Sequence, residues 1–205
     1  MNAFDETPGG MSVSGEVAAR LAGARVVVGV CGGIASYKIC AVVSALAQNS
    51  VETTVAMTPS ATRFVTPLTF QALSGRPVFT SQWDQFDQAD PQHVRLADGL
   101  DAVMVAPCTM NTVARLAAGF ADDAVTSIIA AVDRSRTPVL VAPSMNAEMW
   151  NQPATRRNLD QLRQDGFQII EPEEGWQACR RSGPGRLPEP ARLIAELAAV
   201  VGSDG

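Results

Sequence analysis

The feature that most constrains the fold is a series of short apolar runs, each followed by a helical pattern. The run "ARVVVGVCGG" (residues 24–33) is rich in β-branched residues and ends in glycines, which is typical of a strand buried on both faces of a parallel sheet. Residues 34–48 then carry apolar side chains at helical spacing. Further strands are predicted at 51–57, 101–107, 137–143 and 167–172, and further helices at 68–73, within 110–132 with a break near Gly119, at 154–166 and at 190–201. This alternation predicts an α/β fold with a doubly wound, mainly parallel sheet and helices on both faces.

The length and composition indicate one globular domain. The chain has 205 residues, of which 46% are hydrophobic and 18% charged, so it can bury a substantial core. Residues 1–20 lack a clear periodicity and are predicted to form a flexible tail. The remaining residues, 21–205, are predicted to form the single domain.

Charge and composition argue against several classes of function. The net charge is −5 and no basic stripe is present, which disfavours nucleic acid as a partner. The polar, acidic N-terminus does not resemble a signal peptide, and no apolar run approaches the ~18 residues of a membrane span. A cytoplasmic protein without a membrane partner is therefore expected. The four cysteines form no CxxC pair and there is one histidine, so neither a metal site nor a disulfide framework is predicted.

Polar and glycine-rich turns follow four of the predicted segments. They are Gly32–Gly33, Thr58–Ser60, "PCTMNT" (107–112) and "PSMN" (143–146). Ligands of doubly wound sheets bind beyond the carboxyl ends of the strands, where these turns would meet. The glycine pair suits an anion at a helix N-terminus, but GxGxxG and P-loop motifs are absent. A mononucleotide cofactor is the favoured ligand, although each turn taken alone is equally consistent with an ordinary turn or a helix cap.

Three residues are candidates for chemistry. His93 is the only histidine and is either a proton-transfer group or a structural or solvated loop residue. Cys179 lies in an Arg- and Gly-rich segment, 172–186, predicted to be a polar loop; nearby guanidinium groups favour a reactive thiol. Asn146 follows a strand and is either a helix cap or an amide that binds a ligand. No GxSxG motif of a serine hydrolase is present.

Taken together, five segments resemble the homo-oligomeric flavin-containing cysteine decarboxylases. These are "GGIASYK", "AMTPSATRFVTPLTFQALSG", His93 with "LADGLDAVMVAP", "PSMNAEMW" and "ACRRSGPGR", in this order over residues 25–190. The pattern PxMNxxMW at 143–150 is the most specific of them. The chain departs from the family at Arg180, which replaces a glycine, and at Leu187, which replaces a methionine.

The resemblance implies a flavodoxin-like fold that binds FMN. It also implies a homo-oligomer, either a trimer or a dodecamer built of trimers, with active sites between subunits. Within the family the chain is most similar to enzymes of coenzyme A synthesis that convert 4'-phospho-N-pantothenoylcysteine into 4'-phosphopantetheine and CO2, via thioaldehyde and ene-thiolate intermediates. Many bacterial relatives carry the ligase that makes this substrate on the same chain, so a separate ligase is expected here.

The resemblance also implies roles for individual residues. His93 matches the catalytic histidine, Asn146 the amide that holds the substrate carboxylate, and Cys179 the thiol that donates a proton late in the reaction. Met145, beside Asn146, is expected to contact the substrate. The residues expected to contact FMN are Gly32, Gly33, Ile34, Thr58, Ser60, Thr109, Met110, Asn111, Thr112 and Ser144.

Three alternatives remain at this stage. A peptidyl-cysteine decarboxylase of the lantibiotic type would share the histidine, the PxMN turn and the flavin. A flavin prenyltransferase is disfavoured because that family lacks the PxMN turn and the equivalent of His93. A non-catalytic flavin-binding regulatory protein is disfavoured because such relatives usually carry long acidic tails or lose the catalytic cysteine, whereas Cys179 is present.

Overall fold

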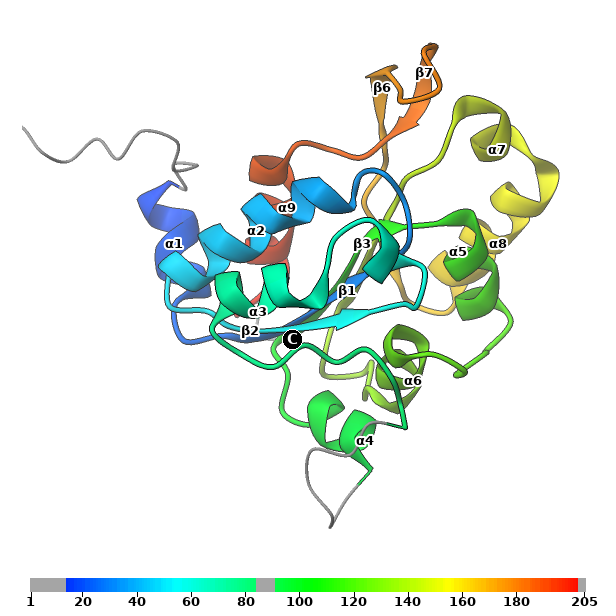
Figure 1. Cartoon of the computed structure of the whole chain (residues 1–205). Helices are drawn as coiled ribbons and strands as arrows, with labels where there is room; N and C mark the ends of the chain where they lie inside the picture. The colour runs from blue at the N-terminus through cyan, green and yellow to red at the C-terminus, as the bar shows by residue number, and fades with distance from the viewer. Residues whose placement is uncertain (1–13, 84–90, 203–205) are drawn as a thin grey trace, which may run out of the picture.

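A computed structural model describes residues 14–83 and 91–202 and contains a five-stranded parallel sheet (Figure 1). The strand order is β2-β1-β3-β4-β5, which is the order of flavodoxin-like folds. The strands are β1 (Arg25–Val30), β2 (Glu52–Met57), β3 (Ala102–Cys108), β4 (Val139–Pro143) and β5 (Gln168–Ile169). The predicted doubly wound sheet is confirmed.

Strands β3 and β4, both in the interior of the sheet, show why the strands could be predicted from the sequence. Every residue of β3 and of β4 is buried, because both faces of a parallel sheet are covered. Within this sheet, β5 is much shorter than predicted, because it spans only two residues of the predicted strand 167–172. A strand this short at the sheet edge contributes little burial, and its sequence signal is correspondingly weak.

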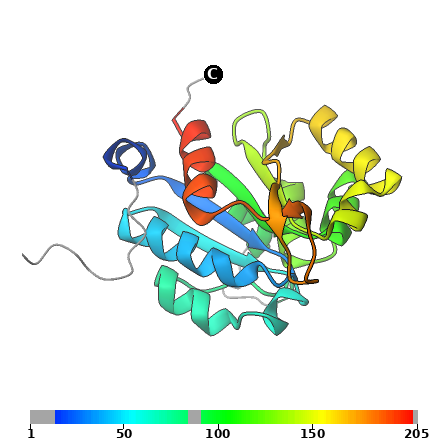
Figure 2. The same cartoon turned by 90° about the horizontal axis from the view of Figure 1, so that it is seen from above.

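Helices cover both faces of the sheet (Figure 2). One hydrophobic cluster packs the sheet against α1 (Gly15–Leu21), α2 (Ser36–Gln48), α3 (Pro67–Ser74) and α9 (Pro190–Val200). The other cluster packs it against α4 (Gln92–Ala97), α5 (Met110–Ala117), α6 (Ala124–Ala131) and α8 (Pro153–Gln164). Short helices η1 (Ala61–Arg63) and α7 (Ala147–Asn151) follow β2 and β4. No helix within residues 14–83 and 91–202 combines the length and apolar character required to cross a membrane.

The predicted tail, residues 1–20, is too long at its C-terminal end. Helix α1 begins at Gly15, where the Ser14 hydroxyl accepts a hydrogen bond from the Val17 amide at 3.4 Å. Its last residue, Leu21, is buried in the core, and Arg20 donates to the Ala199 carbonyl at 3.4 Å. Contacts with the distant helix α9 thus hold a seven-residue helix that is too short to show periodicity in the sequence. Residues 1–13 lie outside the described part of the chain.

The segment 172–186 forms a β-hairpin where a polar loop was predicted. Strands β6 (Glu173–Trp176) and β7 (Ser182–Arg186) pair antiparallel, and the hairpin projects from the edge of the molecule (Figure 1). Glycine and proline in β7 lower its intrinsic strand propensity. The strand is held instead by tertiary contacts, because the Met145 amide donates to the Gly185 carbonyl at 3.0 Å.

Candidate active site

A cavity of about 1040 Å³ lies at the carboxyl ends of the central strands. Its walls come from the turns after β1, β2, β3 and β4 and from the β6–β7 hairpin. Strand β2 is added on one side of β1, whereas β3, β4 and β5 are added on the other, so the strand order reverses between β1 and β3. Such switch points open a crevice for ligands. The volume is at the upper end of the range for small-molecule sites, roughly 300–1,000 Å³, so it can hold a cofactor together with a substrate.

The turn after β1 is closely fitted to the turn after β2. A Cβ atom on Gly32 would lie 2.3 Å from the Ser60 Cβ and 2.7 Å from its carbonyl carbon. The buried hydroxyl of Ser36 donates to the carbonyls of Cys31 at 2.9 Å and Gly33 at 2.6 Å. Glycine is therefore required at position 32 by close approach of the backbone, and Ser36 fixes the shape of the turn.

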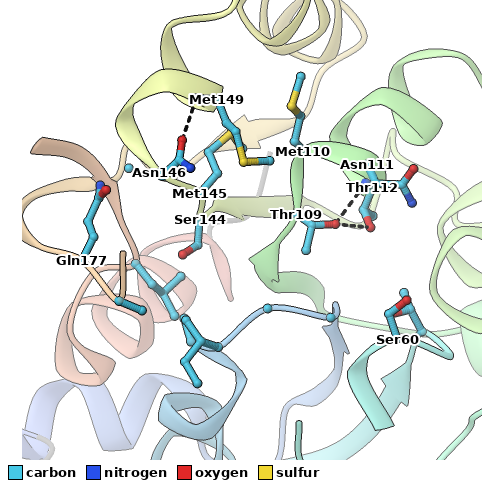
Figure 3. Close-up of a pocket in the computed structure, with 18 of the residues that line it drawn as sticks. Ser60, Thr109, Met110, Asn111, Thr112, Ser144, Met145, Asn146, Met149 and Gln177 are labelled. Carbon is cyan, nitrogen blue, oxygen red and sulfur yellow. Dashed lines mark hydrogen bonds between the residues drawn. The ribbon is translucent and has the colours of Figure 1, made fainter. Parts of the chain in front are cut away.

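The start of α5 places uncharged polar groups on the cavity wall. Thr109 is the N-cap, and its hydroxyl accepts from the Thr112 amide at 3.3 Å and lies 3.1 Å from the Thr112 hydroxyl (Figure 3). The capping role considered for this turn is confirmed. Met110 and Asn111 line the same wall.

Asn146 is the N-cap of α7, and capping determines the orientation of its amide. Its Oδ1 accepts from the Met149 amide at 2.9 Å (Figure 3). Nδ2 makes no hydrogen bond with any residue in the described part of the chain. Because Asn146 lines the cavity, the amide presents its donor group, rather than its acceptor, to a ligand.

The β6–β7 hairpin closes one side of the cavity and carries Cys179. It is fixed to the Asn146 turn by the Met145–Gly185 hydrogen bond and by the close fit of Gly183, whose Cβ would lie 3.0 Å from that of Ala147. Cys179 is exposed and lines the cavity, and its thiol donates to the Gln177 Oε1 at 3.6 Å.

Lys38 and Arg186 bring positive charge to the cavity wall. Lys38 Nζ lies 2.9 Å from Glu189 Oε1, and Arg186 also pairs with Glu189. The Lys38 hydrogen bond is the main reason that the pKa of Glu189 is lowered. Two cations share one carboxylate, so this wall favours an anionic ligand. Both cations end segments that carry the family resemblance, but sequence reasoning missed their shared pairing with Glu189 because α2, β7 and the start of α9 meet only in the fold.

The other cysteines do not line the cavity. Cys31 and Cys108 are buried, and the Cys108 thiol donates to the Thr109 carbonyl at 3.8 Å. Burial raises the pKa of Cys108 well above its usual range, and the neighbouring Cys108 thiol lowers the pKa of Cys31. Cys40 is partly buried in the core. Among the described residues no group of three or more potential metal ligands is found.

The structure brings together most of the predicted site residues, with one exception. Met145, Asn146, Cys179 and all ten predicted FMN contacts line the cavity. His93 does not. It is half-buried on the short helix α4, which lies on the side of the molecule remote from the hairpin (Figure 1). Within one chain, His93 and Cys179 therefore belong to different surfaces.

The fold and the cavity define a flavodoxin-like protein with a ligand site at the β1/β3 switch point. Residues 14–202 match the model of the Flavoprotein family, and the chain belongs to this family. The family resemblance seen in the sequence is thereby confirmed.

Named relatives are consistent with this assignment. The Coenzyme A biosynthesis bifunctional protein CoaBC of Bacillus subtilis is 46% identical over 165 residues, which are 80% of this chain and 40% of the relative. CoaBC of Mycolicibacterium smegmatis is 46% identical over 177 residues, 86% of this chain and 41% of the relative. The chain thus spans about two fifths of the length of these relatives.

Solved structures of similar proteins share the fold. A PPC decarboxylase mutant in complex with pantothenoylaminoethenethiol superposes with a TM-score of 0.79 at 27% identity, covering 86% of this chain and 97% of that chain. The FMN-dependent cysteine decarboxylase SpaF has a TM-score of 0.77 at 32% identity, covering 88% of this chain and 97% of that chain.

Proposed function

We propose that this protein is an FMN-dependent carboxy-lyase that decarboxylates 4'-phospho-N-pantothenoylcysteine to 4'-phosphopantetheine in coenzyme A synthesis. The observation that carries the proposal is the convergence of Asn146, Cys179 and the Gly32 turn on one cavity. The similarity to CoaBC supports the choice of substrate. The free state of all four cysteines is consistent with the cytoplasm, where we place the reaction.

The cavity fits FMN. Gly32 leaves room for the backbone turn that would face the phosphate or the ring, and Ser60, Thr109, Asn111 and Thr112 offer uncharged polar groups. FMN held there would supply a two-electron acceptor for oxidation of the substrate thiol to a thioaldehyde and a hydride donor for the later reduction. A thioaldehyde is needed because its C=S group accepts the electrons released when CO2 leaves.

Asn146 and Cys179 then have separate roles. The Asn146 Nδ2 holds the substrate carboxylate through a neutral hydrogen bond, which stabilises the ground-state anion less than an ionic bond would. The Cys179 thiol gives a proton to the carbon that has lost CO2. Met145 and Met149, which line the cavity beside Asn146, exclude water from the carboxylate.

We propose that His93 reaches the site from a second copy of the chain. Large apolar side chains are exposed both around the cavity, at Ile34, Tyr37 and Trp176, and on α4, at Val94. Exposed apolar side chains that gather in one region, as those around the cavity do, mark interaction surfaces. Two different surfaces that meet head to tail generate a ring when the rotation between subunits closes, which suits the trimer, or dodecamer of trimers, implied by the family resemblance.

A complementation experiment tests this arrangement. His93→Asn and Asn146→Asp variants are each expected to be inactive, whereas their co-expressed mixture should regain about a quarter of wild-type activity, because one site in four would combine an intact His93 with an intact Asn146. Activity is measured on the purified mixed oligomer. A mixture as inactive as its parents would show that both residues act within one subunit.

The proposed reaction has a direct test. Purified protein is expected to be yellow from bound FMN and to convert phosphopantothenoylcysteine into a product lighter by one CO2, detected by mass spectrometry. A protein that binds FMN but leaves this substrate unchanged would exclude the proposed substrate.

A second candidate is a peptidyl-cysteine decarboxylase, because SpaF is described as an FMN-dependent cysteine decarboxylase and is 32% identical. The same assay, repeated with a peptide ending in cysteine, distinguishes the two. We expect conversion of the phosphorylated substrate and no change in the peptide, since Lys38 and Arg186 favour an anionic group.

A Cys179→Ser variant is expected to release CO2 but to stop at the enethiol. Serine keeps the size of the side chain but is a much weaker acid than a thiol, so protonation of carbon fails. In a single turnover with enzyme in excess, mass spectrometry should detect a product lighter than the substrate by CO2 and two hydrogens. A normal yield of phosphopantetheine would contradict the role of Cys179.

A further inference from the structure

Gln177 is a buried polar residue beside the cavity with no role in the proposed reaction so far. Its exposed fraction is 8%, although it lies in the turn of the hairpin, where the neighbouring residues Trp176, Ala178 and Cys179 are exposed. A buried amide is costly unless its hydrogen-bonding groups are paired. Here both ends of the amide have partners within the hairpin.

The donor end of the amide is held by the opposite strand. Nε2 donates to the Pro184 carbonyl at 2.7 Å and to the Gly183 carbonyl at 3.3 Å. Carbonyl oxygens accept hydrogen bonds and cannot donate them, so these contacts fix which end of the amide is the nitrogen. The Gln177 amide is therefore locked onto β7, which is itself fixed to the Asn146 turn through Gly185 and Met145.

The acceptor end of the amide faces the Cys179 thiol. Oε1 lies 3.6 Å from Sγ, within range for a hydrogen bond to sulfur. Because an amide oxygen has no proton to give, the thiol must be the donor in this contact. The contact thus requires a hydrogen on the sulfur and restricts the direction of the S–H bond.

The backbone of Gln177 also closes the turn that carries Cys179. The backbone N–H of Gln177 donates to the Arg181 carbonyl at 2.9 Å, and the backbone N–H of Arg180 donates to the backbone carbonyl of Gln177 at 2.9 Å. Arg180 adopts a left-handed conformation with φ of 62°, which is unfavourable for a residue with a Cβ atom. The tight turn is maintained despite this cost, and it sets the position of Cys179 relative to Gln177.

We propose that Gln177 is a positioning residue that holds the S–H bond of the Cys179 thiol in its orientation until the decarboxylated substrate is formed. This inference rests on the proposed function of Cys179. In the step concerned, the S–H bond of Cys179 breaks and a C–H bond forms at the carbon that lost CO2. The ene-thiolate becomes a thioaldehyde, Cys179 becomes a thiolate, and the returned hydride reduces C=S; solvent reprotonates Cys179.

The test compares products after a single turnover, with the FMN-loaded enzyme in excess over substrate. Gln177→Met keeps the length of the side chain but removes both the carbonyl oxygen and the NH2 group of the amide. We expect it to release CO2 nearly as fast as wild type and to raise the ratio of enethiol to phosphopantetheine by about tenfold or more. Gln177→Glu retains an acceptor for the thiol but loses the donor to Gly183 and Pro184, and a smaller rise is expected. Gln164→Met, on the exposed surface of α8, is the matched control.

The product ratio separates positioning from general stability. It records the fate of each molecule that has lost CO2, so it does not depend on the fraction of enzyme that is folded. A variant with slower CO2 release and an unchanged ratio would overturn the proposal, because Gln177 would then merely support the hairpin. Should Gln177→Met fail to fold, Gln177→Asn, which keeps the amide but draws it back by one methylene, provides the same test.

A second measurement does not depend on turnover. The rate at which iodoacetamide modifies Cys179, followed by peptide mass spectrometry, should rise several-fold in Gln177→Met and remain at the wild-type value in Gln164→Met. An unchanged rate in Gln177→Met would show that the amide does not restrain the thiol. If wild-type enzyme releases no CO2, the proposed function fails, whereas the alkylation result still decides whether Gln177 holds Cys179.

Discussion

An Asn146→Asp variant is expected to fold normally, to bind FMN and to lose decarboxylation by about a thousandfold or more. Aspartate caps helices as well as asparagine does, so the bond from the Met149 amide that begins α7 is retained. The variant loses the Nδ2 donor, and a carboxylate faces the substrate carboxylate in its place. Like charges in a partly buried site repel each other strongly. Single-turnover CO2 release and the flavin absorption spectrum measure the two effects separately.

An Asn146→Ser variant is the matched control for the added charge. Serine also caps helices, but it introduces no negative charge and its hydroxyl is too short to reproduce the Nδ2 contact. We expect activity between that of wild type and Asn146→Asp, with the difference between the two variants reporting the cost of the charge. Full activity in Asn146→Asp would show that the amide does not contact the carboxylate.

The fold was predictable because its signals are local. Strands β3 and β4 are buried along their whole length, so their apolar character survives in the sequence as uninterrupted runs. The turns that follow them carry threonine and asparagine for reasons that also act locally, such as the caps made by Thr109 and Asn146. Fold class and most of the cavity wall could therefore be deduced before the structure.

The rest of the site depends on contacts between distant segments. Lys38 on α2 meets Glu189 at the start of α9 only after folding, and the amide of Gln177 is paired across a hairpin whose strands have weak propensity. No periodicity or motif signals such pairs. His93 is a different case, because its proposed place in the site depends on a second copy of the chain.

The two departures from the family pattern have different physical consequences. Leu187 is 1% exposed and packs in the core, where exchange between leucine and methionine conserves volume. Arg180 occupies a left-handed conformation that glycine would adopt without strain. The backbone hydrogen bonds of Gln177 with Arg180 and Arg181 hold the turn in place despite this strain.

A Gly32→Ala variant is expected to lose FMN and to be purified without colour. The added Cβ would lie 2.3 Å from the Ser60 Cβ and 2.7 Å from its backbone carbon. A flexible side chain could move away, but here the backbone must shift, and the turns after β1 and β2 would separate. Overpacking of this kind costs about 1–3 kcal/mol, equivalent to a fall in melting temperature of about 2–12 °C for a domain of this size.

Gly33→Ala is the steric control, because its Cβ would meet only the Thr109 Cγ2 at 3.8 Å, an ordinary contact. In cofactor-free protein, thermal unfolding should therefore separate the two neighbouring substitutions, with a lower melting temperature for Gly32→Ala alone. Titration with FMN then shows whether the altered turn still binds the cofactor. Wild-type affinity in Gly32→Ala would mean that the close approach of Gly32 to Ser60 does not shape the cofactor site, and that FMN is held mainly by the α5 wall.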